Sequence, residues 1–114
     1  MKIIEIKDLL EAEILCGSEH IENDCMSACG SDMMSDVLAF VKNQAVLLTG
    51  LVNPQVIKTA VMMDMYCIVF VRSKQPTLEM IELAEEAGIV LLSTGKRMFE
   101  ACGLLYANGL KGEH

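Results

Sequence analysis

Three short apolar runs, whose starts lie about 22 residues apart, constrain the fold of this chain more than any other feature of its sequence. The runs are Ala45–Thr49, Cys67–Val71 and Ile89–Leu92. None alternates apolar and polar residues, so each is typical of a strand buried on both faces, as in a parallel sheet. A segment with helical periodicity follows each run. The sequence therefore predicts an α/β fold, a mainly parallel sheet of βα units with helices on both faces.

The predicted helices begin and end at residues typical of helix termini. Asn53 and Pro54 form a cap and a first turn, Thr77 caps the next helix, and Gly88 ends it. The apolar face of the first of these helices consists of Val56, Ile57, Ala60 and Val61. In the last helix, which stops at Asn108, the i, i+3, i+4, i+7 positions are Met98, Ala101, Cys102 and Leu105. These helix termini fall between the predicted strands, as the βα units require.

The region before the first apolar run is predicted to add one strand and two helices. Ile3–Leu10 is a short helix, Glu13–Cys16 a strand, and Cys25–Cys29 an extended segment that leads to a helix opened by Ser31. The buried stripe of that helix is Met34, Val37, Leu38 and Val41. No linker or low-complexity segment interrupts the chain, so we expect one domain, residues 1–114.

Charge and cysteine content exclude several classes of protein. Nine Lys and Arg against sixteen Asp and Glu give a formal charge of -7, which argues against a general nucleic-acid binder. The longest uncharged stretch, Asn43–Ile57, is too short for a membrane span, and Glu5, Lys7 and Asp8 interrupt the apolar core that a signal peptide needs after Lys2. Five cysteines without a secretion signal indicate reduced thiols. We therefore expect a cytoplasmic protein with no membrane or nucleic-acid partner.

Polar and basic residues gather in the loops that follow the three predicted strands. In parallel sheets these loops form the usual ligand edge. The candidate ligand-binding residues there are Thr49, Gly50, Asn53, Arg72, Ser73, Lys74, Ser93, Thr94 and Lys96. With Arg97, four of the nine basic residues lie in two of these loops, which suits a small anion. The alternative is that the hydroxyls and Asn53 are caps and that the basic side chains are solvated.

Other chemistry has less support in the sequence. Cys25 and Cys29 invite a metal or redox interpretation, but a closed site needs about four ligands and no third nearby cysteine completes one. His20 has no orienting carboxylate on a rigid element, so no nucleophilic pair is indicated. We expect no catalytic residues, no metal and no cofactor.

Two adjacent methionine pairs bear on assembly. Neighbours on a helix cannot face the same way, so one member of Met33-Met34 and one of Met62-Met63 is expected to be exposed or to lie in a subunit contact. A Met-rich core is the alternative. We predict a symmetric homodimer.

The strings GSDMMSDVLAF, LLTGLVNPQV and ELAEEAGIVLLST occur in this order. Together they resemble the DRTGG domain family, which is similar to the N-terminal domain of HPr kinase/phosphorylase. The resemblance runs from Glu13 to about Leu110. It departs from the family pattern at two places: Gly50-Leu51-Val52 stands where Gly-Asp-Arg is expected, and Val71-Arg72-Ser73 where Thr-Gly-Gly is expected.

The resemblance implies an α/β domain without kinase chemistry that dimerises and accompanies nucleotide-sensing CBS pairs, phosphotransacetylases or kinase domains. Short forms similar to this chain occur in anaerobes near hydrogenase and redox-sensing genes. The leading hypothesis is a non-catalytic regulatory or assembly module that binds a small anionic ligand, phosphate-bearing or nucleotide, and a protein partner. One alternative is a phosphoryl-transfer accessory enzyme acting through Lys96, although its loops lack an acid for Mg²⁺. Another is a metal or redox protein using Cys25 and Cys29.

Overall fold

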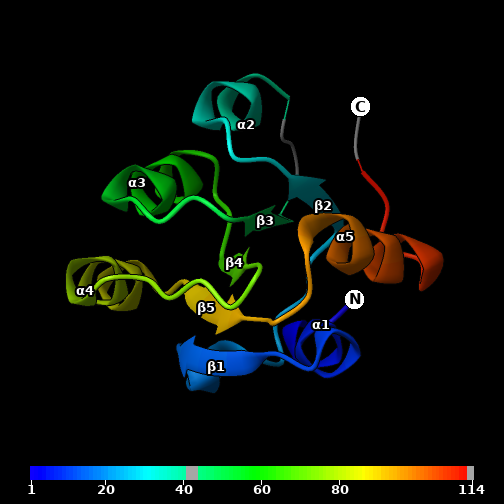
Figure 1. Ribbon diagram of the computed structural model, residues 1–114. Helices are drawn as coiled ribbons and strands as arrows, with labels where there is room; N and C mark the ends of the chain where they lie inside the picture. The colour runs from blue at the N-terminus through cyan, green and yellow to red at the C-terminus, as the bar shows by residue number, and fades with distance from the viewer. Residues whose placement is uncertain (41–43, 113–114) are drawn as a thin grey trace.

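The computed structural model describes residues 1–40 and 44–112 and contains a five-stranded sheet in the order β1-β5-β4-β3-β2 (Figure 1). Strands β2 to β5 are parallel, and β1 pairs with β5 in the antiparallel direction. The strands are β1 (Glu13–Cys16), β2 (Ser27–Gly30), β3 (Ala45–Thr49), β4 (Cys67–Phe70) and β5 (Val90–Ser93). The predicted mainly parallel α/β architecture is confirmed.

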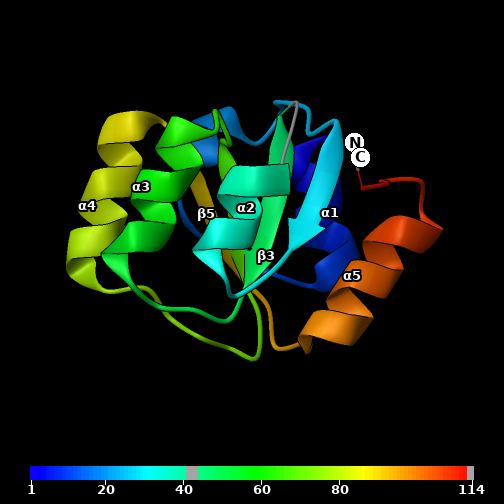
Figure 2. The same ribbon diagram turned by 90° about the horizontal axis from the view of Figure 1, so that it is seen from above.

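Helices cover both faces of the sheet, as Figure 2 shows from above. On one face lie α2, α3 and α4, and on the other α1 and α5. The helices are α1 (Ile3–Leu10), α2 (Met34–Phe40), α3 (Pro54–Met62), α4 (Leu78–Ala87) and α5 (Met98–Ala107), with a 3₁₀ turn, η1 (Ser18–His20). In residues 1–40 and 44–112, no helix is both long enough and apolar enough to cross a bilayer.

The uninterrupted apolar runs have a direct structural cause. Leu47, Ile68 and Leu91 lie side by side in the register and pack beneath α2, α3 and α4. The residues next to them in each strand, such as Val46 and Val69, pack beneath α1 and α5. Because both faces of β3, β4 and β5 are buried, both sets of alternating side chains must be apolar.

Two predicted core positions are wrong. Val61 is 50% exposed, because the buried stripe of α3 is centred on Val56 and Ala60 and its flank is taken by Thr59. Leu38 is 40% exposed, since the short helix α2 buries Val37. Val41, predicted for the same stripe, lies outside the described residues.

Candidate functional site

The loops that follow β3, β4 and β5 meet at the carboxyl edge of the parallel strands. The backbone N–H of Arg72 donates to the carbonyl of Lys96 at 2.8 Å, and that of Ser73 donates to the carbonyl of Thr94 at 2.8 Å. The guanidinium of Arg72 lies over Gly50, 2.5 Å from where a Cβ would stand, so a larger residue at this position would displace the flexible end of the Arg72 side chain. The structure thus brings the three predicted loops together.

Asp32 fastens the loop after β3. Its Oδ1 accepts hydrogen bonds from Thr49 Oγ1 at 3.0 Å and from the N–H of Gly50 at 2.7 Å. In the sequence, Asp32 stands beside Ser31 near a helix start, a place typical of a carboxylate that caps a helix. Its contacts follow from its position: Asp32 comes after β2, and β2 is the parallel neighbour of β3. The carboxylate therefore reaches the loop at the end of the adjacent strand.

The hydroxyls after β5 are engaged inside the protein. Ser93 Oγ donates to the carbonyl of Lys74 at 2.9 Å and accepts from Gln75 Nε2 at 3.2 Å. Thr94 Oγ1 donates to the carbonyl of Leu10 at 2.7 Å and accepts from the N–H of Lys96 at 3.2 Å. Both side chains join the loop to neighbouring segments, so their hydrogen-bonding capacity toward a ligand is largely used.

The three helices that start at this edge differ in their caps. Asn53 Oδ1 accepts from the N–H of Gln55 at 2.8 Å, and the Thr77 hydroxyl accepts from the N–H of Met80 at 3.2 Å. Arg97 occupies the N-cap of α5 and makes no side-chain cap hydrogen bond. The first turn of α5 therefore retains N–H groups that a ligand can bind.

The basic side chains are distributed around that open helix start. Arg72, Lys74 and Arg97 are exposed. Lys96 Nζ lies 3.4 Å from Glu11 Oε2 and is the more enclosed partner of this ion pair. The carboxyl edge thus offers three exposed cations and one that is paired.

Arg72 and Ser73 share an unusual backbone conformation. Both have φ of +57°, in the left-handed region that disfavours residues with a Cβ. These are the two positions at which the family pattern has consecutive glycines. The loop keeps the glycine-type backbone although this chain carries Arg and Ser there.

Cys25 and Cys29 do not converge. Cys25 is buried in the core beneath α1 and α5, and Cys29 packs against the core on the other face. A hydrogen bond from the Cys67 thiol lowers the pKa of Cys25, and the same contact with burial raises the pKa of Cys67. The described part of the chain holds no group of three His, Cys, Asp or Glu side chains placed to bind a metal ion.

Comparison with known proteins identifies the family. The model of the DRTGG domain matches residues 5–107. No curated protein matches the chain. Among solved structures, the CBS and DRTGG domains of the regulatory region of Clostridium perfringens pyrophosphatase, complexed with its activator diadenosine tetraphosphate, are similar.

That structure superposes with a TM-score of 0.72 at 18% sequence identity, a likeness that concerns the fold. The match covers 91% of this chain but only 45% of the other, so this chain spans less than half the length of that structure. The chain belongs to the DRTGG domain family.

Proposed function

We propose that this protein is a non-catalytic regulatory module that binds a phosphate-bearing ligand, of the nucleotide class, at the carboxyl edge of its sheet. Its family membership and the similar fold in a regulatory region that binds a nucleotide activator support this role. With its five free cysteines, such a module belongs in the cytoplasm.

The observation that carries the proposal is the uncapped start of α5. Its free N–H groups and helix dipole favour an anion, as do Arg97 at the cap and Arg72 and Lys74 on the adjacent loop. Glu100, in the first turn of α5, competes for the same groups and limits the affinity. A phosphate at this point would meet backbone donors and guanidinium groups together.

The engaged polar side chains support a role without chemistry. Asp32 is held by Thr49 and Gly50, and Thr94 by Leu10 and Lys96, so these groups serve the loop framework. A phosphoryl-transfer enzyme needs acids that hold Mg²⁺ beside the phosphate. At the start of α5 the neighbouring side chains are mainly basic, which suits binding better than transfer.

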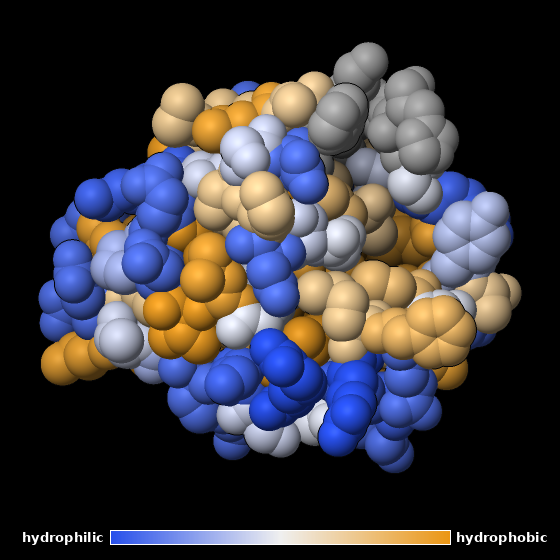
Figure 3. All heavy atoms as spheres, turned by 45° about the horizontal axis from the view of Figure 1, so that its top comes forward, coloured by the Kyte–Doolittle hydropathy of each residue, from blue (hydrophilic) through white to orange (hydrophobic). Residues whose placement is uncertain are grey.

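We further propose that the protein acts as a homodimer. Met62 is 68% exposed at the end of α3, next to the exposed Val61 of the same helix, and Leu38 is exposed on α2, which packs against α3. Hydrophobic residues are grouped between hydrophilic clusters on this side of the molecule (Figure 3). Such groups are common in subunit contacts.

Isothermal calorimetry with sulfate, AMP and ATP tests the ligand proposal. We expect binding that weakens with salt and that Lys74→Glu weakens about tenfold or more. The matched control is Lys58→Glu, because Lys58 is an exposed lysine of α3 away from this edge. Equal effects of the two reversals, or no binding tighter than about millimolar, would overturn the proposal.

A further inference from the structure

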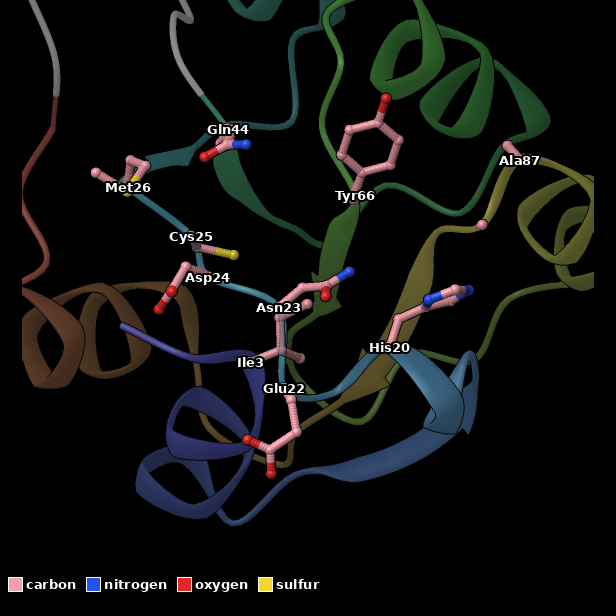
Figure 4. Close-up of a pocket in the computed structure, with 11 residues that line it drawn as sticks. Ile3, His20, Glu22, Asn23, Asp24, Cys25, Met26, Gln44, Tyr66 and Ala87 are labelled. Atoms are coloured by element: carbon pink, nitrogen blue, oxygen red, sulfur yellow. The ribbon is translucent and has the colours of Figure 1, made fainter.

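A hollow lies at the amino edge of the sheet, opposite the candidate ligand edge. It encloses about 690 Å³, within the range of small-molecule sites. Segments directly before β3, β4 and β5 meet there with the turn after η1 and with the start of α1. Its lining residues include Ile3, His20, Asn23, Cys25, Gln44 and Tyr66 (Figure 4).

The middle of this hollow is lined by uncharged polar side chains, while Glu22 and Asp24 lie on its rim. In Figure 4 the amide of Asn23 and the sulfur of Cys25 point toward the middle, and the ring of Tyr66 lies across from them. The side-chain amides of Asn23 and Gln44, two exposed residues, have no hydrogen-bond partner among residues 1–40 and 44–112. Tyr66 is 45% exposed, so its ring is available for contact.

The two acidic residues of the rim each lie near a cationic group. Glu22 Oε2 lies 3.2 Å from Lys2 Nζ, and Asp24 Oδ1 lies 3.8 Å from the N-terminal amino group of Met1. Both carboxylates are directed away from the middle of the hollow (Figure 4). A cationic ligand would therefore compete with Lys2 and the N-terminal amino group for these carboxylates.

An anion is equally poorly matched. The described residues that line the hollow include no Lys or Arg, and His20 Nε2 lies 3.6 Å from Glu19 Oε1, so a phosphate would have no unpaired cationic partner there. An aromatic ring that offers a stacking face and two amides that both donate and accept hydrogen bonds suit a planar, uncharged heterocycle. Buried Ile3 adds an apolar wall.

We propose that this hollow binds an uncharged purine base or its nucleoside, stacked on Tyr66 and hydrogen-bonded by Asn23 and Gln44. The site is separate from the carboxyl edge and does not depend on the phosphate proposal. A phosphate would contribute nothing to binding here and would lie near the acidic rim. Adenosine and inosine are therefore the probes, with AMP as the charged comparison.

Calorimetry with adenosine and inosine tests the site. We expect Tyr66→Leu to weaken binding about tenfold or more, since an aromatic side chain stacked on a base contributes an effect of this size. Tyr106→Leu is the matched control, because Tyr106 is a similarly exposed tyrosine on α5 outside the hollow. The double variant Asn23→Ala/Gln44→Ala is expected to weaken binding while its thermal unfolding stays unchanged.

Three results would overturn the proposal. The first is no binding of either nucleoside tighter than about millimolar. The second is an equal effect of Tyr66→Leu and Tyr106→Leu. The third is AMP binding that Lys74→Glu abolishes together with nucleoside binding, because this would place both ligands at the carboxyl edge. Loss of AMP binding alone in Lys74→Glu supports two separate sites.

Discussion

The backbone at Arg72 and Ser73 is the clearest case of a residue-scale feature that the sequence did not predict. A left-handed φ is normally inferred from glycine or asparagine, and neither is present here. The hydrogen bonds from both N–H groups to the loop after β5 hold the conformation. The tertiary contact therefore imposes a local structure that the two residues disfavour.

Replacing Ser73 by glycine should stabilise the protein by about 0.5–1 kcal/mol, because glycine adopts a φ of +57° without the Cβ clash. Urea unfolding measures the change. The matched control is Ser35→Gly in helix α2, which should destabilise by about 0.5 kcal/mol. If both substitutions destabilise, the left-handed strain at Ser73 is not real.

Ionisation of the cysteines predicts how stability depends on pH. The pKa of four thiols is raised, chiefly by burial in three of them and by the hydrogen bond with Cys25 and then burial in Cys67, while the pKa of Cys25 is lowered. The four are Cys16, Cys29, Cys67 and Cys102. As pH rises past the ordinary thiol pKa of 9.0, the unfolded chain loses these protons before the folded chain does, so the free energy of unfolding falls.

Urea unfolding at pH 8 and pH 10, with a reductant present, checks this dependence. Stability should be lower at pH 10, because four thiols act in this direction and Cys25 alone opposes them. The Cys102→Ala variant should lose less stability between pH 8 and pH 10 than the wild type, because it lacks one thiol whose pKa is raised by burial. A stability that rises from pH 8 to pH 10 would contradict the assignment.

At the scale of elements, the sequence was most informative where packing on both faces forces a pattern. The runs that became β3, β4 and β5 were found within one residue at each end, because a strand covered on both sides is apolar along its length, with Thr49 and Ser93 only at the carboxyl ends. Helix ends were found for a similar reason, since Asn53 and Thr77 satisfy orphan N–H groups locally. Val61 was misplaced because its burial depends on how α3 is rotated against the sheet.

Removing an N-cap side chain that makes a hydrogen bond should reduce stability more than removing one that makes none. Asn53→Ala should destabilise the protein by about 1 kcal/mol, because it removes the bond to the N–H of Gln55. Arg97→Ala at the start of α5 should change stability much less, since Arg97 makes no such bond. Thermal or urea unfolding compares the two variants, and equal losses would show that the cap hydrogen bond is not what stabilises α3.

At the scale of the whole molecule, the sequence located the loops of the candidate site but not the state of their side chains. Parallel topology alone places the ends of β3, β4 and β5 at one edge. Which groups remain free there depends on contacts with distant segments, such as Thr94 with Leu10 and Lys96 with Glu11. The amino-edge hollow was missed altogether, because it is built from five short segments with no shared motif.

The proposed dimer makes a prediction at the same scale. Light scattering at tens of micromolar should give twice the chain mass of 12.5 kDa. Met62→Glu should shift the protein toward the monomer, because it places a charge in the exposed apolar group at the end of α3. Leu78→Glu, at an exposed leucine on α4, is the control that should leave the dimer intact. A wild-type monomer would rule out the dimer.

The central claim, that a phosphate-bearing ligand binds at the carboxyl edge, is tested most directly by an NMR titration of the ¹⁵N-labelled protein with AMP. The account predicts that the largest amide shifts cluster at Gly50, Ser73, Gly95 and the first turn of α5. These shifts should be lost in Lys74→Glu and kept in Lys58→Glu. Shifts centred on the amino-edge hollow, or none at millimolar AMP, would contradict it.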